Sequence, residues 1–304
     1  MERTLPAHSL AFRLRRAANW LPMGFAYAFL YMGRYNLTVA KNALGDVLSK
    51  EDFGRIFFVG AIVYGTSFLL NGPFIDRVGG RKGMLIGVLG ALIANVLMGV
   101  VLLGRVHWGW DVSIVWAFIA LFALNMYFQS FGAVAIVTVK APWFHVRERG
   151  TFSTIFGILI AAGIYFAFDW GAAIVDATRA TPKELGLVAS AFAWLFGLGG
   201  SGVNEDWMLF FVPAVFLAVF WAIMFVWLRD TPAAAGFPEF DTAEASLSAN
   251  GERLPVLEAI RRIATHPVLL FVCLIELCSG IIRNGVLTWY PIFGKEIGLN
   301  KSFW

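Results

Sequence analysis

The chain has 304 residues, of which 59% are hydrophobic and only 14% are charged, and its mean hydropathy is +0.72. Because soluble domains carry about 25% charged residues, this composition excludes an ordinary soluble domain and predicts an integral membrane protein that contacts a lipid bilayer. The net charge of +4 does not call for nucleic acid as a partner, since positive residues collect on the cytoplasmic loops of membrane proteins.

Apolar runs that are long enough to cross ~30 Å of hydrocarbon as helices recur along the chain. They predict an all-α fold with seven transmembrane helices, whose expected bounds are Trp20–Leu44, Gly54–Ile75, Gly83–Leu103, Ser113–Val139, Ser153–Ala173, Trp207–Leu228 and Val268–Phe293. A further apolar run between residues 184 and 202 is too short for a comfortable span. We expect it to form an interfacial or partly buried hairpin on the extracytoplasmic side, within a segment 170–206 whose role the sequence leaves open.

The composition also divides the chain into three parts. Residues 1–228 are predicted to form an N-terminal six-helix bundle, and residues 268–304 the first helix of a second bundle. Between them, residues 229–267 are rich in proline, alanine, serine and acidic residues, which is typical of a linker. Within this linker, residues 254–264 have the pattern of a short amphipathic helix at the membrane surface.

Lys and Arg residues favour the connections that share a side of the membrane with the N-terminus. Loops enriched in these residues remain in the cytoplasm. We therefore expect a multi-pass protein of the cytoplasmic (inner) membrane with a cytoplasmic N-terminus.

The connection between the second and third predicted helices reads NGPFIDRVGGRKG, from residue 71 to residue 83. An ordinary charged turn is the alternative interpretation, but the pattern resembles the signature loop of the major facilitator superfamily of secondary transporters. Glycine allows the two helix ends to approach closely, and Asp76 is expected to cap a helix N-terminus or to pair with a neighbouring cation. The resemblance assigns a conformational role to six residues of the loop, namely Gly72, Asp76, Arg77, Gly79, Arg81 and Lys82. The segment WFHVRERGTFST, between the fourth and fifth helices, supports the same resemblance.

Two arginines interrupt apolar runs where hydrocarbon is expected. Arg34 lies midway along the first predicted helix and Arg283 midway along the seventh. Each would cost about 2.5–3.5 kcal/mol if it faced lipid. The first helix holds no acidic residue, whereas Glu276 lies two turns before Arg283 and is interpreted either as its neutralising partner or as a proton carrier.

Facilitator folds are built from two six-helix halves with a substrate site at the midplane between them, so the first and seventh helices are equivalent. Two arginines that converge there suit a dianion, because each guanidinium takes a phosphate or carboxylate in bidentate fashion. The segments YMGRYNLTVAKNAL and IIRNGVLTWYPIF resemble the first and seventh helices of the organophosphate:phosphate antiporter family, which contains transporters of phosphorylated metabolites and a sensor. The resemblance implies that substrate is bound by Arg34, Arg283, Tyr27, Tyr31, Tyr64 and Gln129. Packing is the alternative role for Tyr27 and Tyr31.

Four positions depart from the glycerol-phosphate members of that family. Phe68 replaces a lysine and Ile160 a histidine, while Tyr35 and Thr288 replace the two members of an ion pair. A buried pair is expected to be lost as a unit. The polar surroundings of the predicted clamp therefore differ, which argues against glycerol 3-phosphate as the substrate.

The sequence thus predicts a secondary transporter that exchanges a phosphorylated small metabolite for inorganic phosphate, and that is monomeric when complete. A membrane sensor with the same fold is the first alternative. A membrane-embedded phosphatase is disfavoured, because no nucleophile with an acid/base partner lies near the arginines. No cofactor, metal site or nucleic-acid partner is expected. Because seven helices do not form two bundles, we expect the natural protein to continue for about five more helices.

Overall fold

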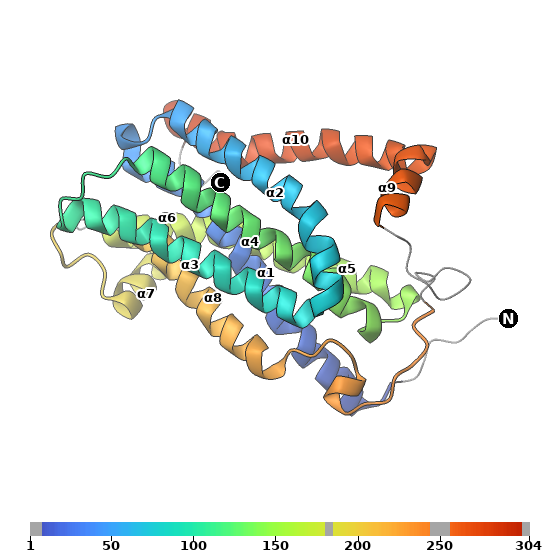
Figure 1. Cartoon of the computed structure of the whole chain (residues 1–304). Coiled ribbons are helices and arrows are strands. Elements are labelled where there is room, and N and C mark those ends of the chain that lie inside the picture. The colour runs from blue at the N-terminus through green and yellow to red at the C-terminus, as the bar shows by residue number, and fades with distance from the viewer. Residues whose placement is uncertain (1–7, 180–184, 244–255, 300–304) are drawn as a thin grey trace. The chain divides into compact units, whose positions relative to one another are not determined.

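The computed structural model describes residues 8–179, 185–243 and 256–299, and within these ranges all regular structure is helical (Figure 1). The chain divides into two compact units, Met1–Phe240 and Asp241–Trp304. The all-α prediction is therefore confirmed for the part of the chain that the structure describes.

The first unit is a bundle of long helices joined by short connections. Its helices are α1 (Leu10–Leu44), α2 (Lys50–Val78), α3 (Gly80–His107), α4 (Ile114–Trp143), α5 (Arg149–Tyr165), α6 (Gly171–Thr178), α7 (Leu187–Phe196) and α8 (Met208–Trp227). Single turns lie at η1 (Gly45–Val47), η2 (Val146–Glu148) and η4 (Ala233–Ala235), and a π-helical turn, η3 (Phe166–Trp170), joins α5 to α6.

The second unit contains α9 (Val256–Thr265) and α10 (Pro267–Glu296). The helix α9 falls where the amphipathic segment was predicted, and it is supported by an ion pair between Glu258 and Arg262 one turn apart, with 2.9 Å between Oε1 and Nε. Residues 244–255, which include part of the predicted linker, lie outside the described residues.

Six helical segments of the described residues are long and apolar enough to cross a membrane. They are Lys50–Val78, Gly80–His107, Ile114–Trp143, Val146–Thr178, Met208–Trp227 and Pro267–Glu296. Six of the seven predicted spans thus correspond to these segments, whereas the first predicted span lies in α1, which is not apolar enough to belong to the set. The membrane crossing of the first predicted span, Trp20–Leu44, therefore stays a prediction. The short helix Leu187–Phe196 occupies the apolar run that was predicted not to cross.

The low hydropathy of α1 follows from its place in the bundle. This helix packs most extensively against α8 and α5 and also contacts α3, α4 and α6. Its Phe29 is buried, and its ring stacks on Phe216 of α8 and Phe166 of η3, with ring centroids 4.6 and 5.3 Å apart. A helix that is surrounded by other helices does not need an apolar surface toward lipid, and its polar side chains can face the bundle interior.

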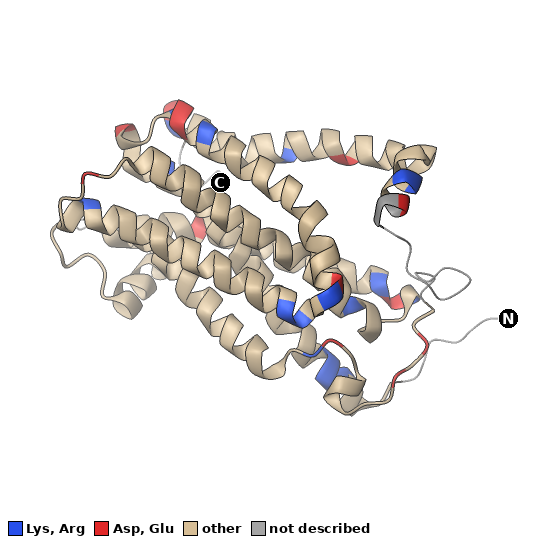
Figure 2. Cartoon of the chain, in the orientation of Figure 1, with Lys and Arg blue, Asp and Glu red and all other residues tan. Residues whose placement is uncertain are grey.

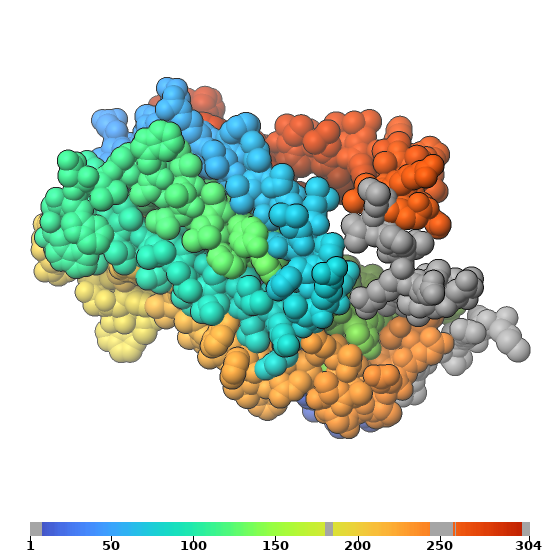
Figure 3. Space-filling model, viewed as in Figure 1, coloured from blue at the N-terminus to red at the C-terminus, as the bar shows by residue number. Residues whose placement is uncertain are grey.

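The outer helices pack closely because glycine occupies their contacts. The pairs α3–α4 and α2–α4 make the most extensive contacts of the unit, and the side chains of α2, α3 and α4 form a continuous surface in the space-filling view (Figure 3). A Cβ added at Gly87 of α3 would lie 2.8 Å from the carbonyl oxygen of Phe128 in α4. Close approach of this kind is how helices associate where lipid provides no hydrophobic drive.

The first unit extends beyond the predicted end of the bundle. Residues 229–240, which were predicted to begin the linker, belong to this unit. The side chain of Asn19 exchanges two hydrogen bonds with the backbone of Arg229, at 2.7 and 3.1 Å. The rings of Phe237 and Phe240 pack against Phe12 of α1, with centroids 5.6 and 5.7 Å away. These contacts fold the segment after α8 back onto the start of α1.

Candidate functional site

Arg34 lies in α1 among groups supplied by two other helices. Its Nε donates a hydrogen bond to Oε1 of Gln129 in α4, at 2.9 Å. Its guanidinium carbon lies 4.4 Å from the ring centroid of Tyr64 in α2 and 5.0 Å from that of Tyr31 in α1. The structure therefore brings together four of the residues that the sequence predicted to bind substrate, all of them in the first unit.

Tyr27 takes a different place from Tyr31. Its side chain is buried and packs edge-on against the Tyr31 ring, 5.4 Å between centroids, and against Phe156 of α5, 5.6 Å away. Tyr31 is only half-buried and carries the contact with Arg34. Tyr27 therefore packs against Tyr31, and its contact with substrate stays a prediction, whereas the Tyr31 ring itself contacts the charged group.

A chain of buried amides fixes the orientation of Gln129. Its Nε2 donates to Oδ1 of Asn125 at 3.1 Å, and Nδ2 of Asn125 donates to the carbonyl oxygen of Gly33 at 3.0 Å. Both amide side chains are buried. Because the Gln129 NH₂ group is used by Asn125, its oxygen is the end left to face Arg34. Sequence reasoning missed Asn125, although an amide one helical turn before Gln129 in an apolar helix was the available signal.

The charge of Arg34 has no acidic partner in the described part of the chain. Its Nε is used by Gln129, and its two terminal nitrogens donate to no described residue. Aromatic faces attract a cation by about 0.5–2 kcal/mol each, so two tyrosine rings offset only part of the cost of removing this charge from water. The geometry leaves the outer fork of the guanidinium open for bidentate contact with an anion.

The predicted departures in the first unit give this region an aromatic surrounding. Phe68 packs edge-on against Tyr64, with ring centroids 4.8 Å apart. Tyr35 is buried, and its ring lies 6.0 Å from that of Tyr31 and 5.9 Å from that of Phe168. A lysine at either position would add a second positive charge near Arg34, and the aromatic rings hold that space instead.

Arg283 lies in α10 of the second unit, seven residues after Glu276. The two side chains form no ion pair with each other within the described residues. Seven residues of helix separate them by about 10 Å along the axis, which is too far for direct contact. The described residues therefore contain no ion pair through which Glu276 would neutralise Arg283. Thr288, the fourth position that differs from the glycerol-phosphate members of the antiporter family, lies on the same helix.

The predicted signature loop is a single-residue connection between α2 and α3. Gly72, Asp76 and Arg77 are part of α2, and Gly79 alone joins the helices, with φ of +92° and ψ of 149°. These angles lie in a region that only glycine adopts without strain. Figure 2 shows that Lys and Arg residues, including those of the α2–α3 turn, gather at this end of the first unit.

The acidic cap of α3 comes from the segment after α8. Asp230 Oδ1 accepts a 2.6 Å hydrogen bond from the backbone N–H of Arg81, in the first turn of α3. The Arg81 guanidinium donates to the carbonyl oxygen of Phe225 in α8 at 2.7 Å, and Lys82 is exposed. Asp76 lies in the last turn of α2, and its pairing with a cation stays a prediction. The N-terminus of α3 is capped by Asp230, which sequence reasoning missed.

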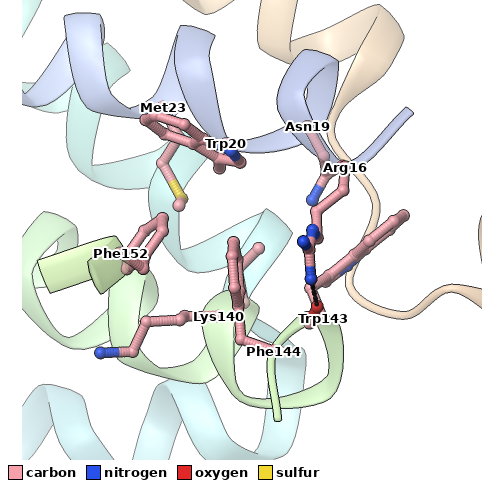
Figure 4. A pocket seen from close by; sticks show the side chains of 9 residues that line it. Arg16, Asn19, Trp20, Met23, Lys140, Trp143, Phe144 and Phe152 are labelled. Carbon is pink, nitrogen blue, oxygen red and sulfur yellow. Dashed lines mark hydrogen bonds between the residues drawn. The ribbon is translucent and has the colours of Figure 1, made fainter. Parts of the chain in front are cut away.

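The connection between α4 and α5 is held onto α1 by an ion pair. Glu148 accepts hydrogen bonds from Arg16 at 3.1 and 3.3 Å, and its Oε2 also accepts from the backbone N–H of His145 at 3.2 Å. Arg16 additionally donates to the carbonyl oxygen of Trp143 at 3.3 Å (Figure 4). In the segment WFHVRERGTFST, which supported the family resemblance, Glu148 therefore fastens helix ends to one another.

The long apolar helices define a multi-spanning, all-helical membrane protein, and the arrangement around Arg34 provides it with a cationic centre. Residues 23–304 match the family model of the Major Facilitator Superfamily. The chain therefore belongs to the major facilitator superfamily, as the signature loop predicted.

The curated relatives include a membrane sensor protein and transporters that are named for phosphorylated metabolites. The membrane sensor protein UhpC of Salmonella typhimurium is 24% identical over 284 residues, which cover 91% of this chain and 55% of UhpC. The glycerol-3-phosphate transporter of Bacillus subtilis is 23% identical over 293 residues, 94% of this chain and 59% of the transporter. A probable hexose phosphate transport protein of Chlamydia muridarum is 23% identical over 221 residues, 72% of this chain and 40% of that protein. The chain thus spans little more than half the length of the first two relatives.

Proposed function

We propose that this chain acts in moving a phosphorylated small metabolite, of the sugar phosphate, glycerol phosphate or phosphoglycerate type, across the cytoplasmic membrane in exchange for inorganic phosphate. The observation that carries the proposal is Arg34, whose terminal nitrogens donate to no described residue while Gln129 and two tyrosine rings hold the group in place. A fixed guanidinium without a carboxylate partner suits a phosphate group. Glycerol 3-phosphate is the least favoured of these substrates, because Phe68 and Tyr35 surround the site with aromatic rings.

In the proposed mechanism, Arg34 and Arg283 bind one phosphate group from opposite halves of a facilitator fold. The support for Arg283 is its place in α10, its lack of an ion pair with Glu276, and the family resemblance of its surroundings. Two guanidinium groups repel each other when the site is empty, and an anion relieves that repulsion. Substrate would therefore bind the closed state more tightly than the open one, which is the differential affinity that drives a change between two conformations.

The second candidate function is a membrane sensor that binds the same ligand without moving it. The match to a membrane sensor protein over 91% of this chain favours it, and the same site residues would serve. Flux separates the two functions, because a sensor requires binding alone.

The experiment uses the natural protein at its full length, reconstituted in vesicles loaded with radiolabelled inorganic phosphate. We expect efflux of label when glucose 6-phosphate, 3-phosphoglycerate or inorganic phosphate is added outside, and no efflux from vesicles containing the Arg34→Gln variant. Binding of these probes without efflux assigns the chain to the sensor function. Absence of both binding and efflux from folded protein contradicts the phosphate site itself.

The proposed topology places the N-terminus in the cytoplasm, and its support is the gathering of Lys and Arg at the end of the unit where α1 begins (Figure 2). Leu14 is exposed in the first turns of α1. With Cys273 and Cys278 replaced by serine, a Leu14→Cys variant should react with a membrane-impermeant maleimide in inside-out vesicles and not in intact cells. Labelling in intact cells would reverse the topology.

A further inference from the structure

A hollow lies at the end of the first unit where α1 begins and α8 ends. It has a volume of about 300 Å³ and is lined by Arg15, Val226, Trp227, Arg229, Ala234 and Ala235. Arg15 and Arg34 belong to the same helix, and at 1.5 Å per residue they lie about 28 Å apart along its axis. The hollow is therefore separate from the site around Arg34, and the proposed transport function makes no use of it.

Both arginines of the hollow are bound to the last carbonyl groups of α8. Arg15 Nη2 donates to the carbonyl oxygen of Trp227 at 2.6 Å. Arg229 Nη1 donates to the carbonyl oxygens of Val226 and Leu228, at 2.9 and 2.8 Å. The C-terminus of a helix carries a partial negative charge, so two like-charged side chains are drawn to the same place.

The backbone around Arg229 is held rigidly. Asn19 exchanges two hydrogen bonds with the Arg229 N–H and carbonyl groups, and Trp143 Nε1 donates to the same carbonyl oxygen at 3.2 Å. Asn19 is buried and Trp143 is fully buried. The arginines are thus presented by a fixed frame that joins α1, α4 and the end of α8.

The positive charge of the hollow is not balanced by the described residues. Neither Arg15 nor Arg229 forms an ion pair within them, whereas the neighbouring Arg16 has Glu148 as its partner. Nη1 of Arg15 is buried and has no hydrogen-bond acceptor in the part of the chain that the structure describes. Burial and then the positive charge of Arg229 lower the pKa of Arg15. An arginine does not lose its proton in a protein, so its charge stays in place. A bound anion would offset the unfavourable burial of that charge and its repulsion from Arg229.

The apolar surroundings indicate what kind of anion fits. Trp227 and Val226 are 52% and 59% exposed, and Phe225 beside them is 54% exposed. They end α8, a helix that is long and apolar enough to span a membrane. A tryptophan at the end of such a helix is typical of the level of lipid headgroups. A small soluble anion would gain nothing from these side chains, whereas a lipid would bury them under its acyl chains.

We propose that this hollow binds the phosphodiester headgroup of an anionic phospholipid, with Arg15 and Arg229 contacting the phosphate and Trp227 contacting the glycerol backbone and upper acyl chains. Basic pockets beside transmembrane helices on the cytoplasmic side are suited to such headgroups. The arginines bind phosphate through paired N–H donors, and the apolar contacts make a whole lipid a better ligand than free phosphate.

The test measures lipid binding to the full chain in a neutral detergent by native mass spectrometry. Phosphatidylglycerol is titrated against phosphatidylcholine of the same acyl chains. We expect one phosphatidylglycerol bound about tenfold more tightly than phosphatidylcholine, and loss of this preference in Arg15→Gln and Arg229→Gln. The matched control is Arg13→Gln, since Arg13 lies in the same turns of α1, is exposed and does not line the hollow. An equal loss in Arg13→Gln would overturn the proposal in favour of general charge attraction.

A second variant keeps both arginines and removes the space. Ala234 is exposed in η4 and lines the hollow, so Ala234→Trp should fill it without disturbing the bundle. We expect this variant to lose the preference for phosphatidylglycerol, and a retained preference would overturn the proposal even if Arg15→Gln does not fold. Displacement of the lipid by equal concentrations of inorganic phosphate or glycerol phosphate would assign the hollow to a soluble anion and equally overturn it. Arg34→Lys should leave lipid binding unchanged, which separates this proposal from that of the transport site.

Discussion

At the end of the first unit where α1 begins, Arg16 is paired with Glu148, and Arg15 and Arg229 lie against the carbonyl groups that end α8. In the middle of α1, by contrast, Arg34 meets one amide oxygen and two tyrosine rings, and no carboxylate within the described residues. Arg16 uses its donors to fasten helix ends to one another, whereas Arg15 and Arg229 each give at least one donor to a helix carbonyl group. Arg34 gives neither of its terminal nitrogens to a described residue, so the two regions differ in how many donors they leave for a ligand.

The largest expected effect comes from changing the shape of the Arg34 side chain without its charge. Arg34→Lys removes the planar fork, so it should weaken the binding of glucose 6-phosphate and inorganic phosphate by about 100-fold, since hydrogen bonds to charged groups contribute about 1.5–3 kcal/mol. Isothermal titration calorimetry measures the change. The control is Arg55→Lys, the same exchange at an exposed α2 position that pairs with Glu51. Binding within twofold of the wild type would remove Arg34 from the site.

The connection between α2 and α3 offers a second contrast, between two glycines of the same signature loop. Gly79→Ala should destabilise the protein by about 2 kcal/mol because of its positive φ, and an added Cβ would also lie 2.8 Å from Oδ2 of Asp230. Gly72→Ala should be neutral or slightly stabilising, because Gly72 is helical and no atom lies within 4 Å of an added Cβ. Thermal unfolding in detergent compares the two. Equal stability of the two variants would contradict the inference that the α2–α3 connection requires glycine at position 79.

The amide chain behind Arg34 should affect binding less than Arg34 itself. Gln129→Leu removes the acceptor of the Arg34 Nε hydrogen bond, and we expect about a tenfold loss of phosphate binding. Asn125→Leu should produce a smaller loss in the same direction, because it frees Gln129 to rotate. Calorimetry compares the phosphate affinity of the two variants, and thermal unfolding checks that they are equally stable. A purely structural role would change stability and would not produce this order of affinities. A greater loss in Asn125→Leu than in Gln129→Leu would contradict this arrangement.

The smallest expected effect concerns the cap of α3. Asp230→Ala removes the acceptor for the Arg81 N–H, and loss of such a cap costs about 1 kcal/mol. Asp46→Ala is the control, because Asp46 is exposed and its side chain makes no hydrogen bond or ion pair among the described residues. Combined with Gly79→Ala, the Asp230→Ala change should destabilise by less than the sum of the two, since the close contact between the two residues disappears. If the two destabilisations add in full, the contact between a Cβ added at position 79 and Asp230 does not contribute to the effect of Gly79→Ala.

The sequence predicted the elements of this protein well because the relevant signal is local. An apolar run of sufficient length forms a helix in a membrane wherever it occurs, so most predicted spans match helices of the structure. Arg34 and Gln129 were predicted together only through the family resemblance, although they lie in different helices. Asn125 was missed, because its importance depends on the carbonyl group of Gly33 in a neighbouring helix.

The cap of α3 shows how far local reasoning reaches. The pattern around Gly79 indicated a close connection between two helices, and it left Asp76 either to cap a helix N-terminus or to pair with a neighbouring cation. The cap of α3 is made by Asp230, which lies 149 residues from Arg81 in the sequence. No periodicity or spacing connects these residues, because the hydrogen bond exists only after α8 has packed against α3.

The amino-acid sequence by itself thus determined the membrane environment, the helices, the anomalous charge of Arg34 and the membership in the superfamily. The first three follow from the high cost of placing polar groups in hydrocarbon, which acts on each segment separately, and the superfamily follows from the motif between the second and third helices. The tertiary structure decided which groups surround each charge: an amide oxygen and two tyrosine rings at Arg34, a carboxylate at Arg16, and helix carbonyls at Arg15 and Arg229. The physical reason is that the energy of a charge depends on its neighbours in space, and packing between distant segments chooses those neighbours.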